Sequence, residues 1–179
     1  KVYRTVPDTS FDAGRRIQEM EVMGVGHQVL SPMPELLSYW LHADDALALT
    51  RFMNDDLASL VQGNPKQFTG LGAVPLQNVD MAIPELERCM RLGLAGVELG
   101  SNINGKPLGH PDHVPFFQAA QSLGAAIFVH ALRPAGMERM VGPPFVEQVL
   151  AFPGEIGLAA ASMLTTGVLT RVPKLRISF

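Results

Sequence analysis

The chain has 179 residues, of which 47% are hydrophobic, and a formal net charge of −3. This length and composition predict one globular domain that spans residues 1–179. Because the chain contains no run of lysine or arginine and no apolar run of about eighteen residues, neither nucleic acid nor a membrane is expected as a partner. The single cysteine, Cys89, has no second thiol with which to form a disulfide or a zinc knuckle, which favours a reducing, cytoplasmic setting.

Short β-branched or aromatic runs alternate along the chain with longer stretches of helical period. This alternation is typical of a parallel sheet whose strands are joined by crossover helices. Several of the runs are continuously apolar, as strands covered on both faces should be. The predicted strands are residues 27–30, 68–74, 96–100, 126–130 and 175–179.

The predicted helices lie between these strands, where apolar residues recur three and four positions apart. Three such segments cover residues 82–90, 116–123 and 159–169, and each precedes a Gly or Pro stop. Two stripes are expected to face the core: Ile17, Met20 and Met23, ended by Gly24, and Ala46, Leu49, Met53, Leu57 and Leu60, ended by the turn at residues 63–65.

The long connections follow the carboxyl ends of strands, at residues 30–43, 100–115 and 130–144. In a barrel of alternating strands and helices this is the face that carries the active site. We therefore predict an α/β fold, a (β/α)8 TIM barrel. Five strands cannot close such a barrel, so we expect the chain to supply roughly its second to sixth strands and to be incomplete at both ends.

His130 differs from the other histidines because it ends the apolar run AIFVH and so should project from a strand end into the barrel mouth. A rigid strand end suits a metal ligand, since it holds the imidazole at a fixed distance and angle. No HxH, HExxH or paired carboxylate accompanies it nearby. From the residues alone, a metal ligand and a buried, hydrogen-bonded histidine both remain open.

The other histidines are expected to be structural. His110 and His113 lie in GHPDH, which we interpret as a solvated loop with a helix N-terminus at Asp112. His27 and His42 have no convergent partners in the sequence.

A polar triplet, Asn54, Asp55 and Asp56, interrupts the second helical stripe. Adjacent helical residues point in different directions, so these carboxylates do not form a catalytic dyad. We expect one polar residue of the triplet to bond a neighbouring loop and the others to be solvated. The GLG of residues 70–72 lacks the GxGxxG spacing and predicts no nucleotide site.

Several phrases, in order, resemble the 2-amino-3-carboxymuconate 6-semialdehyde decarboxylases of the metal-dependent amidohydrolase superfamily. They cover nearly the whole chain, which makes the resemblance specific although each phrase alone is weak. The phrases are KVYRTV (1–6), RIQEMEVMGV (16–25), LSPMP (30–34), SYW (38–40), NDDLAS (54–59), GLGAVPLQ (70–77), ELERCMRLGLAGVELG (85–100), FVH (128–130) and PKLRISF (173–179).

The resemblance implies a divalent metal, usually zinc, bound by an HxH pair on the first strand, a histidine that ends the fifth strand and an aspartate after the eighth. Only the fifth-strand position falls within this sequence, and FVH places it on His130. The catalytic histidine of the family belongs to an HGGG-like phrase after the sixth strand, which is expected just beyond Phe179. No catalytic residue is therefore assigned in this chain.

Two candidate substrate-binding residues are Arg4, which follows from the resemblance, and Trp40, which lies in a long loop after a predicted strand. KVYRTV resembles a phrase whose arginine binds a substrate carboxylate, which carries over to Arg4, and a planar guanidinium suits a carboxylate. Trp40 is expected either to stack on a flat substrate or to anchor its loop. The family usually continues FVH with Pro-Trp, but residues 131–134 here are ALRP, so a different carboxylated substrate is a live alternative.

The expected function is a metal-dependent decarboxylase that acts on a small unsaturated or aromatic-derived carboxylate through metal-activated water. The same metal-bound water would attack an amide, a lactone or an activated carbon–carbon bond, so a hydrolase or hydratase is the alternative. A second alternative is a non-catalytic barrel fragment kept for assembly with a partner. The resemblance also suggests a homodimer.

Overall fold

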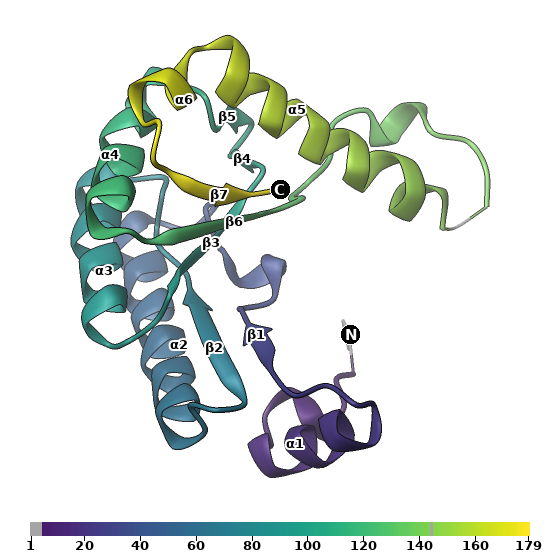
Figure 1. The fold of residues 1–179 in the computed structure, drawn as a ribbon. Coiled ribbons are helices and arrows are strands. Elements are labelled where there is room, and N and C mark those ends of the chain that lie inside the picture. The colour runs from purple at the N-terminus through teal and green to yellow at the C-terminus, as the bar shows by residue number, and fades with distance from the viewer. Residues whose placement is uncertain (1–4, 144) are drawn as a thin grey trace.

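A computed structural model of the chain describes residues 5–143 and 145–179 (Figure 1). Its main sheet has five strands in the order β1-β2-β3-β6-β7, and every neighbouring pair is parallel. The strands are β1 (Gln28–Leu30), β2 (Phe68–Gly72), β3 (Gly96–Gly100), β6 (Ala126–His130) and β7 (Arg176–Ser178). The five predicted strands and their parallel arrangement are confirmed, with boundaries shifted by two residues at most.

The connections between these strands contain the helices of the fold. The longer helices are α1 (Ala13–Val22), α2 (Ala43–Gly63), α3 (Val79–Arg91), α4 (Val114–Leu123) and α5 (Phe152–Thr165), followed by the short α6 (Val168–Arg171). Between β3 and α4, β4 (Asn102–Ile103) and β5 (Lys106–Pro107) form a small antiparallel pair. Short 3-10 turns occupy Asp8–Ser10, Pro34–Leu36, Pro111–His113 and Met137–Arg139, and a π-helical turn, Glu147–Ala151, leads into α5. No helix among the described residues is long and apolar enough to cross a membrane.

The helices α2, α3 and α4 lie along the same side of the sheet (Figure 1). Successive strand residues point to opposite faces, so the buried side chains of Val97, Leu99, Ile127 and Val129 pack into the core under these helices. The intervening residues face the other side of the sheet. A parallel sheet in sequential order with helices on one face is the wall of a barrel, because a doubly wound sheet carries helices on both faces.

The glycines of GLG allow α2 and α3 to approach the sheet closely. A Cβ atom on Gly70 would lie 2.7 Å from Leu94 Cδ2, and one on Gly72 would lie 2.6 Å from Asn54 Oδ1. Both glycines lie within β2. They serve helix–sheet packing.

The two predicted helical stripes face the core only in part. Met20 is buried, but Met23 lies one residue beyond α1 and is 68% exposed, so the prediction that it faces the core is wrong. The reason is that the helix ends before this residue. On α2 the buried positions are Ala46, Thr50, Asn54 and Ala58. Two of them are polar, so the spacing of apolar residues alone does not identify this buried face.

The thiol of Cys89, on the buried side of α3, provides a test of this packing. Burial, together with the negative charge of Glu85, raises the pKa of Cys89 to about 12. Because only the thiolate reacts, iodoacetamide at about pH 8 should leave Cys89 unmodified in the folded protein and alkylate it in urea. Peptide mass spectrometry measures both reactions. Native alkylation at the unfolded rate would show that the face of α3 that carries Cys89 is not packed in the core.

Candidate active site

His130 is the last residue of β6, and its Cα is paired in register with Gly100, the last residue of β3. It shares a face of the sheet with Phe128, because the two residues are two positions apart on a strand. Their ring centroids are 6.4 Å apart in an edge-to-face arrangement. The predicted location of His130 at the carboxyl end of an inner parallel strand is confirmed.

The hydrogen bond of His130 determines which ring nitrogen is available. Nδ1 lies 2.9 Å from the carbonyl oxygen of Ala131. A carbonyl oxygen only accepts, so Nδ1 carries the proton and the lone pair of the neutral imidazole lies on Nε2. The side chain is half-buried. His130 therefore presents the tautomer that a metal ligand requires, with the second nitrogen fixed by a backbone carbonyl.

Glu98 adds a buried carboxyl group to the same face of the sheet. Its Cα is paired in register with Phe128, and the residue is 1% exposed. Burial raises the pKa of Glu98, and a hydrogen bond with Ser31 and the proximity of His130 oppose that rise. Within the described residues its Oε1 has no hydrogen-bond partner. A buried carboxyl oxygen without a partner fits an interior that receives a cation or a hydrogen-bond donor.

Tyr39 fixes the loop after β1 against the end of β3. The backbone N–H of Gly100 donates to the Tyr39 hydroxyl oxygen over 3.1 Å, and Asn104 Nδ2 donates to the Tyr39 carbonyl over 2.7 Å. Tyr39 is 1% exposed, and burial raises the pKa of its hydroxyl above the ordinary range. The neighbouring Trp40 is thus held near the carboxyl ends of the strands.

Glu155, near the start of α5, joins the loops that follow β3 and β6. Its Oε1 accepts from Ser101 Oγ and from Asn102 Nδ2, each over 2.9 Å, and its Oε2 accepts from the Ala135 N–H over 3.1 Å. The N–H of Leu132 donates to Ser101 Oγ over 3.0 Å. These bonds hold the segment after His130 in one arrangement.

A cavity of about 720 Å³ lies where these loops meet. Its lining includes His130, Trp40, Arg133, Glu35 and Phe152. The guanidinium carbon of Arg133 is 4.1 Å from the centroid of the Trp40 ring. The structure therefore brings two of the predicted site residues, His130 and Trp40, into one cavity. The third, Arg4, lies outside the described residues.

Three residues of this site were not assigned from the sequence. Arg133 belongs to the ALRP departure, which was noted without a role for the arginine. Glu98 had a usable signal, since it is a single charged residue within the continuously buried strand GVELG. Glu155 had none, because its partners are loop groups distant in the sequence.

The remaining histidines have structural contacts. His27 lies 2.9 Å from both the Lys66 carbonyl and Thr69 Oγ1, and His42 is exposed beside Asp44. His110 accepts from the Asp112 N–H at the start of the 3-10 turn, as the predicted helix N-terminus requires.

His113 differs from its prediction. It is 2% exposed and lies 3.2 Å from the Leu108 carbonyl through Nδ1, so the interpretation as part of a solvated loop is wrong at this residue. The chain enters α4 directly after His113, which turns its side chain into the core. Burial lowers the pKa of His113.

No group of three or more His, Cys, Asp or Glu side chains within the described ranges is arranged to hold a metal ion. Of the ligand set that the resemblance implies, His130 alone falls among these residues. Any metal centre that includes His130 therefore needs ligands from outside them.

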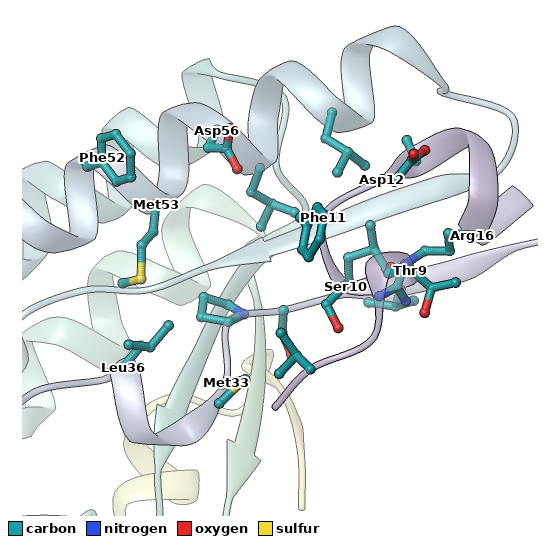
Figure 2. Close-up of a pocket in the computed structure, with 18 residues that line it drawn as sticks. Thr9, Ser10, Phe11, Asp12, Arg16, Met33, Leu36, Phe52, Met53 and Asp56 are labelled. Carbon is teal, nitrogen blue, oxygen red and sulfur yellow. Dashed lines mark hydrogen bonds between the residues drawn. The ribbon is translucent and has the colours of Figure 1, made fainter. Parts of the chain in front are cut away.

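A second cavity, of about 570 Å³, lies between the first residues of the described chain, the segment after β1 and α2. Figure 2 shows Phe11 in this cavity, with Arg16 and Asp12 on one side of it and Phe52 and Leu36 on the other. The Arg16 guanidinium donates to the Thr9 carbonyl and to Gln28 Oε1. These hydrogen bonds join α1 to the turn before it and to β1. This cavity contains no histidine and is not the candidate active site.

Comparison with known families identifies the chain. The family model described as Amidohydrolase matches residues 6–179. The chain belongs to this amidohydrolase family. A 2-amino-3-carboxymuconate-6-semialdehyde decarboxylase of Dictyostelium discoideum is 40% identical over 181 residues, which cover 100% of this chain and 50% of that protein. The family predicted from the sequence phrases is confirmed.

Solved structures of related decarboxylases share the fold. A 2,6-dihydroxybenzoate decarboxylase complexed with 2,6-dihydroxybenzoate has a TM-score of 0.81 at 25% identity and matches 90% of this chain and 53% of its own. A 5-carboxyvanillate decarboxylase of Novosphingobium aromaticivorans, complexed with manganese and a nitrobenzoic acid, has a TM-score of 0.81 at 28% identity and matches 93% and 48%. The amidohydrolase chain thus spans about half the length of these relatives, and its sheet is part of a (β/α)8 barrel, as predicted.

Proposed function

We propose that the protein containing this amidohydrolase chain is a metal-dependent decarboxylase, a carboxy-lyase of small aromatic or unsaturated carboxylates. The observation that carries the proposal is His130 at the carboxyl end of β6, with Nε2 available, in a cavity that also contains an aromatic ring and a guanidinium. Relatives with the same fold are decarboxylases by name, and one was solved with an aromatic carboxylate bound.

A divalent metal would be held here by His130 through Nε2, and Glu98 would add negative charge to the same interior when ionised. Such a metal supplies a water of lowered pKa and a Lewis acid for a substrate oxygen. The residues of this chain bind and orient the substrate. Trp40 provides a flat wall, and the loops held by Tyr39 and Glu155 keep that wall beside His130. We further propose a proton-transferring histidine in an HGGG-like phrase, which this sequence does not contain.

The finer assignments are part of the same proposal. Solved relatives contain manganese, which supports a divalent ion, and we propose zinc as the native metal on the family resemblance. We also propose that residues 1–179 form part of one barrel domain, that the protein is a homodimer and that it is cytoplasmic.

The test uses the intact protein, purified with its metal. Metal content is measured by mass spectrometry, and carbon dioxide release is measured with 2,6-dihydroxybenzoate and with 2-amino-3-carboxymuconate semialdehyde. Release that is lost on chelation and restored by metal is the expected result. Metal-dependent hydrolysis or hydration without carbon dioxide would favour the alternative enzyme class. Absence of both metal and turnover would favour a non-catalytic role and overturn the proposal.

Arg4 supplies a separate prediction, although its placement lies outside the described residues. Arg4→Lys keeps the charge but removes the planar fork that binds a carboxylate with two hydrogen bonds. We expect kcat/KM to fall about ten- to a hundred-fold, with the melting temperature unchanged. Arg4→Ala should be at least as damaging. Near-normal kcat/KM with a lowered melting temperature would make Arg4 a structural residue.

A further inference from the structure

We propose that Asn104 is a site of spontaneous deamidation, and that conversion of its side chain to a carboxylate releases the wall of the active-site cavity at Trp40. The reaction takes place in the β4–β5 hairpin and consumes only water. The inference therefore goes beyond the proposed function and does not depend on which reaction the cavity catalyses.

The hairpin presents a reactive dipeptide to solvent. Asn104 and Gly105 form the turn between β4 and β5, both residues are exposed, and theirs is the only Asn-Gly pair in the sequence. Their φ angles are 52° and 82°, as the type I′ turn of a tight hairpin requires. Asparagine is thermolabile, and glycine is the least hindered residue to follow it because no side chain crowds its nitrogen. A Cβ atom on Gly105 would meet no atom within 4 Å, so the turn has room to rearrange.

The chemistry needs no group beyond the dipeptide and water. The backbone nitrogen of Gly105 attacks Cγ of the Asn104 side chain, and the new N–C bond closes a cyclic imide. The amide nitrogen leaves as ammonia and takes the proton that the attacking nitrogen loses. Water then opens the ring at either imide carbonyl, which gives aspartate or isoaspartate. Both products carry a carboxylate in place of the Asn104 amide.

Two hydrogen bonds of the folded hairpin hold back this reaction. The Gly105 N–H donates to Asn102 Oδ1 over 2.9 Å, and Asn104 Nδ2 donates to the Tyr39 carbonyl over 2.7 Å. The attacking nitrogen and the departing amide are therefore both engaged, and both bonds must open before the imide closes. Asn102 is itself fixed, since its Nδ2 donates to Glu155 Oε1 over 2.9 Å. The rate of deamidation thus depends on local opening of the hairpin at Asn102.

The bond from Asn104 to Tyr39 connects the reaction to the active site. The Tyr39 carbonyl belongs to the peptide group that precedes Trp40, and Trp40 lines the cavity that contains His130. A carboxylate has no proton to donate, so deamidation removes this bond and places a negative charge against the carbonyl oxygen. A second anchor, from the Gly100 N–H to the Tyr39 hydroxyl over 3.1 Å, is unaffected. We expect the loop to stay in place while Trp40 becomes more mobile.

The first experiment measures deamidation in the intact protein by peptide mass spectrometry during incubation at mildly alkaline pH. Wild-type protein should convert Asn104 slowly, and urea-unfolded protein should convert it faster. Asn102→Ala frees the Gly105 N–H and should raise the native rate about five-fold, the effect of losing one hydrogen bond. Asn102→Asp keeps an acceptor for that N–H and should react at a rate closer to wild type. Asn64 and Asn78, which precede proline and valine, should remain intact in every sample.

Two results of this experiment would overturn the inference. If native Asn104 does not react in the time that the unfolded protein takes to convert fully, it is not a deamidation site of the folded protein. If wild type and Asn102→Ala react at equal rates, the hairpin bonds do not control the reaction. Turnover is not measured, so either result is distinct from failure of the proposed function.

The second experiment follows Trp40 itself, through acrylamide quenching and fluorescence anisotropy of the intact protein. Trp40 is the single tryptophan of this sequence, and the signal of Trp40→Phe is subtracted to remove emission from elsewhere. Asn104→Asp, which has the side chain of the direct product, should raise quenching and lower anisotropy, and Asn104→Ala should do the same without a charge. Gln118→Glu, an equal change of charge at an exposed position of α4, is the control and should change neither. Unchanged Trp40 signals in both Asn104 variants would overturn the link between the hairpin and the cavity.

Discussion

In the intact protein, His130→Ala is expected to lose about a hundred-fold or more in affinity for the divalent metal, and with it nearly all turnover. The reason is that His130 Nε2 carries the lone pair, Nδ1 is bonded to the Ala131 carbonyl, and β6 holds the ring rigidly. No neighbouring imidazole replaces it, since the other histidines of the described chain have structural contacts or lie exposed. Metal content after dialysis and kcat/KM are measured on the same preparation.

A ligand role and a packing role give different thermal results for His130→Ala. If His130 binds metal, the metal raises the melting temperature of the wild type and not of the variant, because only a state that binds the ion is stabilised by it. The two metal-free proteins should melt within a few degrees of each other, since the contacts of the His130 side chain within the described ranges are a hydrogen bond to its neighbouring carbonyl and an edge contact with Phe128. His42→Ala, an exposed histidine after β1, is the matched control and should change neither quantity. Stoichiometric metal and normal turnover in His130→Ala would contradict the ligand assignment.

The fold was predictable from the sequence because a parallel barrel wall imposes a simple pattern. Its strands are covered by helices, so apolar runs mark them, and each crossover helix stops at a glycine or proline. The end of such a run also locates the active-site edge, which is why the position of His130 could be predicted from AIFVH. The carboxyl end of a strand can be located from the sequence, because the apolar run stops where the strand stops.

The polar contacts between loops were not predictable in the same way. Arg133 meets Trp40, and Glu155 meets Ser101 and Ala135, through the juxtaposition of connections that are distant in sequence and have no period. His113 was misjudged because a polar phrase indicates a solvated loop unless the following helix turns the residue inward. Pairings of this kind follow from the three-dimensional arrangement of the barrel edge.

Asn54→Ala is expected to lower the free energy of unfolding by about 3 kcal/mol, although Asn54 is far from any proposed chemistry. Asn54 is fully buried on α2 and bonds the residue that follows β2 in both directions. Its Nδ2 donates to the Ala73 carbonyl over 2.9 Å, and its Oδ1 accepts from the Ala73 N–H over 2.8 Å. The same Nδ2 lies 2.7 Å from Oε1 of Glu85, which is also fully buried. Alanine leaves both Ala73 groups without partners and removes one donor to a buried carboxylate.

The polar triplet itself contains the control for Asn54→Ala. Asp56, two residues along α2, is exposed, and Asp56→Ala should change stability by no more than about 0.5 kcal/mol. Asn54→Asp tests the direction of the bonds. An aspartate can still accept from the Ala73 N–H, but it cannot donate to Glu85 and places a second negative charge beside that carboxylate, so it should be at least as destabilising as alanine. Urea unfolding of the three variants measures these differences. Equal stability of Asn54→Ala and Asp56→Ala would show that the Asn54 bonds do not hold α2 to the strand end, and the prediction that one residue of the triplet serves the neighbouring loop would lose its energetic basis.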